Sequence, residues 1–116
     1  MNPYNGPGGK PILPDANYQR SVAQLQGFSN VTLLGYVHGL YGQRDYALVK
    51  KDIDTYHQWD QESRSEEDAF GEMSLDGIFI DEVDFAGQKT DYFKSLCQYV
   101  KSKKWRGRPG TCSPSP

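Results

Sequence analysis

The chain has 116 residues, enough for one domain with a real core, and 36% of them are hydrophobic. Its 15 aromatic residues (8 Tyr, 5 Phe and 2 Trp) argue against a disordered chain, and its net charge of −2 gives no support for a nucleic-acid or anionic membrane partner. No apolar stretch approaches the roughly 20 residues needed to span a bilayer, and the first residues show no signal-peptide pattern.

The first half of the chain predicts a loop, a helix, a strand and a second helix, in that order. Residues 2–15 are dense in Pro, Gly and Asn, which is typical of a loop. A helix is expected over about 16–27, because apolar side chains recur there at helical spacing. Residues 31–37 are rich in β-branched and aromatic side chains and predict a buried strand. After an exit loop, a second amphipathic helix is expected over about 45–59.

The second half predicts one strand and one helix between polar segments. Residues 60–74 are polar and acidic and indicate a solvated loop or a short exposed helix. Residues 77–80 predict a strand, and a third amphipathic helix is expected to begin near Thr90. Residues 108–116 look unstructured.

The two cysteines show neither metal-binding nor redox spacing. Cys97 falls within the third predicted helix, and Cys112 lies in a segment rich in Pro and Ser. We expect Cys97 to be a buried, inert thiol.

Two carboxylates follow directly where the strand at residues 77–80 ends. This strand is apolar on both faces, which is typical of a parallel sheet covered by helices, and Asp81 and Glu82 come next. Chemistry in such sheets gathers at the carboxyl ends of the strands. Charges there cost desolvation energy unless they are paired or used. The two acids are therefore either a functional site, or they cap the next turn or bind a nearby arginine.

The alternation of helices and strands predicts an α/β fold with a parallel sheet. Only two strands are clearly visible in the sequence, and two strands cannot bury three apolar helix stripes. A complete (β/α)₈ barrel needs roughly 250 residues. The sequence therefore predicts either a small open α/β domain or a piece of something larger.

Several blocks of the sequence, in order, resemble the spherulin-4-like proteins. The blocks are Asn2-Pro3 with Gly6-Pro7-Gly8, Tyr18, Gly35-Tyr36-Val37-His38, Tyr41-Gly42 with Arg44, Asp52-Ile53 with Tyr56 and Trp59, and Gly77 to Glu82. Their combined order is far more specific than any single motif.

The resemblance implies a partial (β/α)₈ TIM barrel that is incomplete at both ends. Residues 1–104 would form the partial barrel domain, and residues 105–116 would be an irregular tail outside the fold. In its characterised branch the family is a secreted glycoside hydrolase that acts on galactosamine-containing fungal exopolysaccharide. An extracellular or cell-surface location and a polysaccharide substrate are thus implied for this chain.

Glycoside hydrolysis generally needs two carboxyl groups that flank an oxocarbenium-like transition state. By resemblance, Asp81 and Glu82 form the catalytic acidic centre. Consecutive strand residues point to opposite faces, so both can reach one substrate only if the chain bends out of the strand at Glu82. The opposing carboxylate is expected on a strand beyond this chain.

Other polar and aromatic residues are expected at the same rim of the sheet. The candidate substrate-binding residues are His38, Tyr41, Tyr36, Arg44, Asn2 and Asn5. His38 can bind sugar hydroxyls or be satisfied by the backbone, and Tyr41 can stack on a pyranose ring. Tyr36 can stack too, although core packing suits it better, and Arg44 can pair with Asp81 or with Asp45.

Three functions remain open from the sequence. The first is a fragment of a glycoside hydrolase that is inactive as this short chain, and the second is a non-catalytic cell-surface or carbohydrate-binding protein. The third is a small α/β regulatory domain that is complete in itself. No metal-binding cluster is visible, so metal-independent chemistry without a cofactor is expected.

Overall fold

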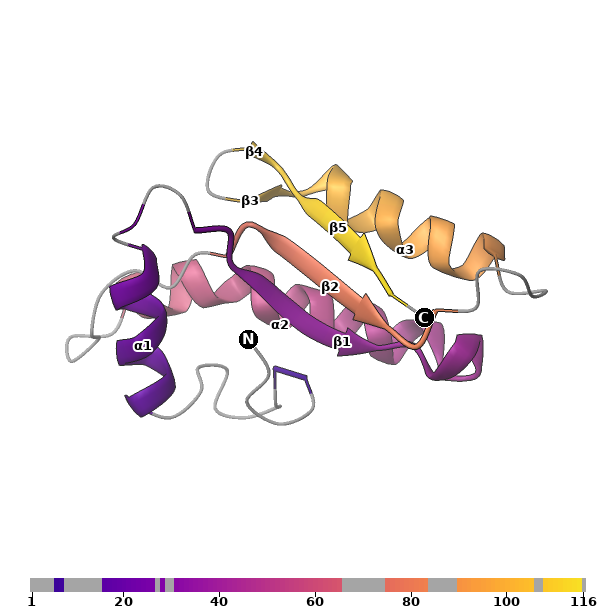
Figure 1. The fold of residues 1–116 in the computed structure, drawn as a ribbon, viewed down its shortest axis with the longest axis horizontal. Helices are drawn as coiled ribbons and strands as arrows, with labels where there is room; N and C mark the ends of the chain where they lie inside the picture. The colour runs from indigo at the N-terminus through magenta and orange to yellow at the C-terminus, as the bar shows by residue number, and fades with distance from the viewer. Residues whose placement is uncertain are drawn as a thin grey trace.

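The computed structural model describes residues 6–7, 16–26, 28, 31–65, 75–83, 90–105 and 108–115. Helices and strands alternate along most of the chain (Figure 1). The elements are α1 (Ala16–Gln26), β1 (Leu34–His38), the 3₁₀ turn η1 (Leu40–Gly42), α2 (Tyr46–Ser65), β2 (Gly77–Asp81), α3 (Thr90–Ser102), β3 (Lys104–Trp105), β4 (Arg108–Pro109) and β5 (Thr111–Pro114).

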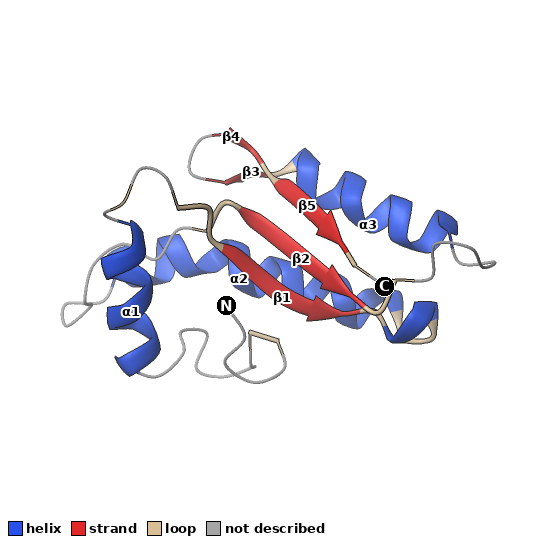
Figure 2. Ribbon diagram, in the orientation of Figure 1, coloured by secondary structure: helices blue, strands red, loops and turns tan. Residues whose placement is uncertain are grey.

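Three parallel strands form the main sheet, in the order β1-β2-β5. Their arrows run in the same direction in Figure 2, so their carboxyl ends share one edge. At that edge His38 lies beside Asp81, and Ile80 lies beside Pro114. The short strands β3 and β4 form a separate antiparallel pair. The predicted parallel sheet with intervening helices is confirmed.

The two faces of the sheet differ in their side chains. Val37, Ile78 and Ile80 are fully buried, and in Figure 1 α2 passes behind β1 and β2. Tyr36 and Asp81 alternate with them on the opposite face and are half-buried. Among the described residues, no helix crosses this second face in Figure 1.

The core lies between the sheet and the stripes of α2 and α3 that the sequence predicts. Ile53 and Tyr56 on α2, and Leu96 on α3, are almost fully buried. A glycine is required at position 35, because a Cβ there would lie 2.6 Å from the Tyr56 ring. Helix α2 extends to Ser65, beyond the predicted end at residue 59, and residues 66–74 lie outside the described residues.

The end of the chain corrects the sequence prediction. Residues 105–116 were expected to be an irregular tail, yet Thr111–Pro114 form the third strand of the main sheet. Strand β5 can lie this close to β2 only because residue 77 is a glycine. A Cβ at Gly77 would lie 2.0 Å from the carbonyl oxygen of Thr111. Trp105, which is 3% exposed, also packs into the core.

The expectation of an inert thiol at Cys97 is wrong as well. Cys97 on α3 forms a disulfide with Cys112 on β5, with a Cα–Cα distance of 5.4 Å. The disulfide covalently joins the last strand of the sheet to the helix that covers it. The sequence did not reveal it because the two residues are brought together by the packing of α3 on β5.

Candidate functional site

The two acidic residues lie at the carboxyl edge of the sheet, beside the end of β1. Two backbone hydrogen bonds join the loops that leave β1 and β2 there. The Gly39 N–H donates to the Asp81 carbonyl at 3.0 Å, and the Tyr41 N–H donates to the Glu82 carbonyl at 2.8 Å. The acid pair therefore sits against the loop after His38, as the shared edge predicts.

The chain bends out of the strand at Glu82. This residue has a φ of 59°, in the left-handed region that side chains other than glycine rarely adopt. The bend breaks the alternation that would send neighbouring side chains to opposite faces. It is the condition under which both carboxyl groups can act on one substrate.

Both carboxylate oxygens of Asp81 accept hydrogen bonds. Its Oδ1 accepts from the Glu82 backbone N–H at 2.9 Å, and its Oδ2 accepts from the Tyr36 hydroxyl at 2.9 Å. Burial raises the pKa of Tyr36 to about 12, together with this hydrogen bond and the charges of Asp81 and Glu82. The Tyr36 phenol is thus protonated, and able to donate, at any ordinary pH.

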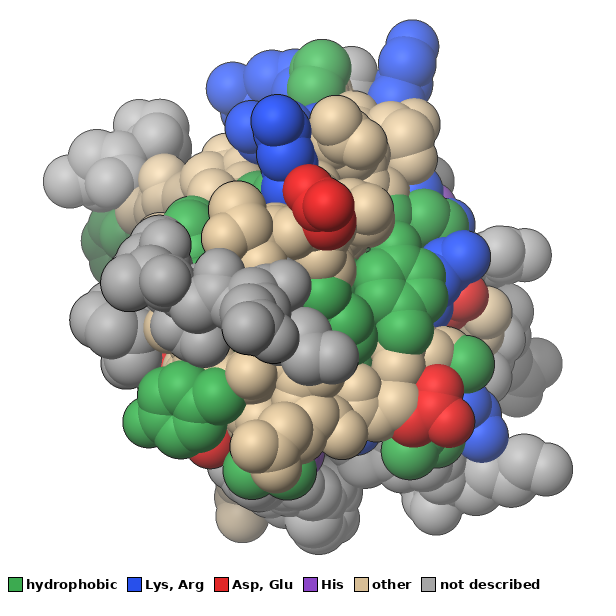
Figure 3. All heavy atoms as spheres, turned by 90° about the vertical axis from the view of Figure 1, so that its right-hand side faces the viewer, with side chains coloured by type: hydrophobic (Ala, Val, Ile, Leu, Met, Phe, Trp, Pro, Cys, Tyr) green, Lys and Arg blue, Asp and Glu red, His purple; other side chains and the backbone are tan. Residues whose placement is uncertain are grey.

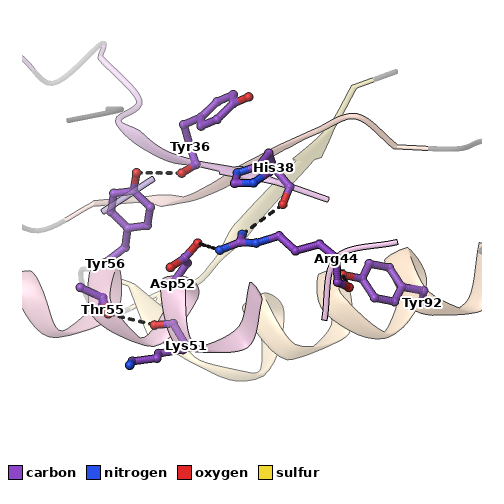
Figure 4. A network of polar contacts seen from close by, with 8 residues as sticks. All are labelled: Tyr36, His38, Arg44, Lys51, Asp52, Thr55, Tyr56 and Tyr92. Atoms are coloured by element: carbon purple, nitrogen blue, oxygen red, sulfur yellow. Dashed lines mark hydrogen bonds and ion pairs between the residues drawn. The ribbon is translucent and has the colours of Figure 1, made fainter. Parts of the chain in front are cut away.

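Arg44 does not pair with either of the acids considered for it in the sequence. It forms an ion pair with Asp52 at 2.7 Å and donates to the carbonyl oxygen of His38 at 3.1 Å (Figure 4). Asp45 accepts instead from the Ala47 N–H, at the start of α2. Arg44 therefore links the end of β1 to α2, and its described contacts do not include the Asp81 carboxylate.

His38 has an unsatisfied polar atom beside the acid pair. Its Nδ1 is buried and has no hydrogen-bond partner among the described residues. The carbonyl of the same residue is held by Arg44, which fixes the backbone from which the ring projects. No described hydrogen bond therefore accounts for this ring nitrogen.

The loop after β1 exposes two large side chains next to the site. Leu40 is 46% exposed and Tyr41 is 51% exposed, and both adopt positive φ values, 50° and 54°. Backbone strain of this kind is often found at binding sites.

The remaining candidates, Asn2 and Asn5, lie outside the described residues. Gly6, next in the chain, is buried, and a Cβ on it would lie 3.4 Å from the Asp52 carboxylate. The N-terminal turn thus approaches the Arg44–Asp52 pair.

Figure 3 looks onto the end of the molecule where the strands finish, and acidic, basic and apolar side chains all reach the surface there. A cavity of about 310 Å³ lies at the opposite edge of the sheet. Its lining residues are Val31, Thr32, Asp76, Trp105, Arg108, Pro109 and Thr111. This cavity is separate from the acid pair.

Two further observations concern only the part of the chain that the structure describes. There, no group of three or more His, Cys, Asp or Glu residues is placed to hold a metal ion. Nor is any described helix long and apolar enough to cross a bilayer.

Comparison with known proteins assigns the chain to a family. The model of spherulation-specific family 4 matches residues 1–115. Spherulin-4 of Physarum polycephalum is 32% identical over 103 residues, which make up 89% of this chain and 26% of that protein. The chain therefore belongs to spherulation-specific family 4, as the sequence resemblance predicted.

A solved relative confirms the fold. The crystal structure of Aspergillus clavatus Sph3 in complex with GalNAc matches with a TM-score of 0.84 at 33% identity, over 97% of this chain and 43% of that chain. The chain thus has the α/β fold of part of a (β/α) barrel. It spans about a quarter of the curated relative and less than half of the solved one.

Proposed function

We propose that this chain is part of a barrel glycoside hydrolase that acts on galactosamine-type polysaccharide, with Asp81 and Glu82 at its acidic centre. The observation that carries the proposal is the position of this acid pair. It lies at the carboxyl edge of a parallel sheet, beside His38, in a chain 33% identical to a protein crystallised with GalNAc.

The chemistry requires a second carboxyl group across the scissile bond. Two groups about 5–5.5 Å apart give retention of configuration, and about 6.5–9.5 Å apart they give inversion. Asp81 and Glu82 are neighbours on one loop, so we expect one of them to act on the sugar while the other tunes it or binds a hydroxyl. The opposing carboxylate would come from a strand other than the three described.

The residues around the pair would hold the sugar. Tyr41 offers an exposed ring for stacking on a pyranose face, and the unsatisfied Nδ1 of His38 offers a polar contact. Asn2 and Asn5 would join them, since Gly6 lies close to Asp52, the ion-pair partner of Arg44. Arg44 would act indirectly, by holding the His38 backbone.

We also propose that the protein works outside the cytosol, at the cell surface or in the extracellular space. The support is the Cys97–Cys112 disulfide, because disulfides persist in oxidising compartments and are rare in the cytosol.

A second candidate function is carbohydrate binding without catalysis. The exposed Leu40 and Tyr41 favour it, because an apolar and aromatic platform can bind a sugar whether or not the acids act. Hydrolysis separates the two candidates.

We expect the 116-residue chain to be inactive alone, because its described sheet has three strands and one uncovered face. The test uses this chain and a chimera in which it replaces the matching part of Sph3. Release of reducing ends from a galactosamine-containing polysaccharide by the chimera, and not by the chain alone, supports the proposal. A folded chimera that binds the polysaccharide without cleaving it supports the second candidate, and turnover by the chain alone contradicts the expected inactivity.

A further inference from the structure

We propose that Tyr36 is a positioning residue, whose hydroxyl fixes the orientation of the Asp81 carboxylate. The proposal rests on the proposed function, because the orientation of Asp81 matters for catalysis only if Asp81 belongs to the acidic centre. It also replaces the core-packing role that the sequence favours for Tyr36.

Tyr36 is held by contacts with two other elements, α2 and β2. Its backbone carbonyl accepts from the Tyr56 hydroxyl at 2.7 Å, so α2 fixes the strand from behind. Its ring stacks on Phe79, with centroids 6.0 Å apart and planes 25° apart. Figure 4 shows the Tyr36 side chain on the side of the strand away from Tyr56. The phenol is therefore a rigid donor on the face that the helices leave open.

The hydrogen bond from Tyr36 links Asp81 to another strand. The Glu82 N–H also donates to Asp81, but Glu82 is the next residue in the chain, so this hydrogen bond does not tie Asp81 to another element. The Tyr36 hydroxyl comes from β1, 45 residues away in sequence, and reaches the other carboxylate oxygen at 2.9 Å. With one donor on each oxygen, rotation of the carboxylate about its Cβ–Cγ bond breaks a hydrogen bond.

The same contact raises the pKa of Tyr36, after the larger effect of burial, to about 12. The titration of Tyr36 therefore reports on its contact with the Asp81 carboxylate.

The structure offers a matched control elsewhere. Tyr99 on α3 donates its hydroxyl to the carboxylate of Asp54 on α2, on the helix side of the molecule. Burial raises the pKa of Tyr99, and the hydrogen bond with Asp54 adds to the effect. Tyr99→Phe removes a bond of the same kind without touching the acid pair.

The first experiment is independent of activity. The pH titration of the Tyr36 ring is followed by NMR in the 116-residue chain, in its Asp81→Asn variant and in its Asp54→Asn variant, which loses the acceptor of the Tyr99 hydroxyl instead. We expect the midpoint to fall below about 12 in Asp81→Asn, because the negative charge beside the phenol is gone, and to stay in place in Asp54→Asn. A midpoint that stays in place in Asp81→Asn overturns the proposal.

If Asp81→Asn does not fold, the kinetic comparison of Tyr36→Phe with its parent decides the role of Tyr36.

The second experiment uses the chimera, compared with its own variants. Tyr36→Phe should lower kcat by about tenfold to a hundredfold with KM nearly unchanged. Tyr99→Phe should change neither. An unchanged kcat in Tyr36→Phe, or an equal loss of kcat in Tyr99→Phe, would overturn the positioning role. An inactive parent chimera counts against the proposed function, while the NMR titration still decides the role of Tyr36.

Discussion

At the scale of single residues, the site depends on how the backbone is bent and held at the ends of two strands. Glu82 adopts a φ of 59°, and its carbonyl accepts from the Tyr41 N–H. Such a conformation costs roughly 1–2 kcal/mol for a residue with a Cβ. The fold tolerates it because hydrogen bonds from the neighbouring loop hold the turn in place.

This strain predicts a difference between two variants of Glu82. Glu82→Gly and Glu82→Ala both remove the carboxyl group, but only glycine relieves the left-handed conformation. We expect the free energy of unfolding of Glu82→Gly to exceed that of Glu82→Ala by about 1 kcal/mol. Urea denaturation of the two variants measures it. An alanine variant that is equally stable would show that the bend is not strained.

Residue roles at the site were predicted from the sequence only in part. The position of Asp81 beside His38 followed from two strand ends at one edge of a parallel sheet. The partners of Arg44 and Tyr36 did not follow. The first depends on how the turn between η1 and α2 places Arg44, and the second on which face of β1 the Tyr36 side chain leaves. Three acids, Asp45, Asp52 and Asp81, were available to Arg44 by residue type alone.

At the scale of elements, strands and helices with a strong pattern were predicted and β5 was missed. The helices repeat apolar residues at helical spacing, and β2 is a continuous apolar run. Strand β5 reads Thr-Cys-Ser-Pro, which has no such run. It is a strand because it pairs with β2, passes close to Gly77 and is bonded to α3.

The disulfide should therefore stabilise the last strand. Reduction by a dithiol breaks the Cys97–Cys112 bond, which closes a loop of 15 residues, and should lower the free energy of unfolding by about 2–4 kcal/mol. The Ser115 N–H, which donates to the Ile80 carbonyl at 2.8 Å, should exchange faster with solvent after reduction. Hydrogen exchange with and without the dithiol measures both effects.

The control is the double variant Cys97→Ser/Cys112→Ser, in which the dithiol should change nothing. If exchange at Ser115 is the same in the oxidised and reduced chains, β5 does not depend on the disulfide. Because the Val83 N–H in turn donates to the Ser115 carbonyl at 2.9 Å, loosening β5 would also release the segment just after the acid pair.

At the scale of the whole molecule, the described sheet has two edge strands, β1 and β5, and a face that no described helix covers. In a closed barrel both edges would be paired, and this face would point inward. Its residues Tyr36, His38 and Asp81 are polar or aromatic and half-buried, which suits the wall of a ligand-binding interior.

This arrangement predicts that the isolated chain is less stable than the chimera with Sph3. We expect a lower melting temperature and a broader transition for the chain alone, because the sheet that the structure describes has two edge strands and one face without a covering helix. Circular dichroism during heating measures both. A sharp, cooperative melt of the isolated chain at the temperature of the chimera would favour the third function considered, a small α/β domain complete in itself.

The central claim is that the acid at the end of β2 performs chemistry on an amino-sugar polysaccharide. The most direct measurement is the release of reducing ends by the chimera carrying Asp81→Asn, beside a control carrying Asp91→Asn, an exposed acid in the first turn of α3. We predict that Asp81→Asn lowers the rate by about a hundredfold or more, and that Asp91→Asn leaves it within about twofold. Equal rates for the two variants would contradict the claim.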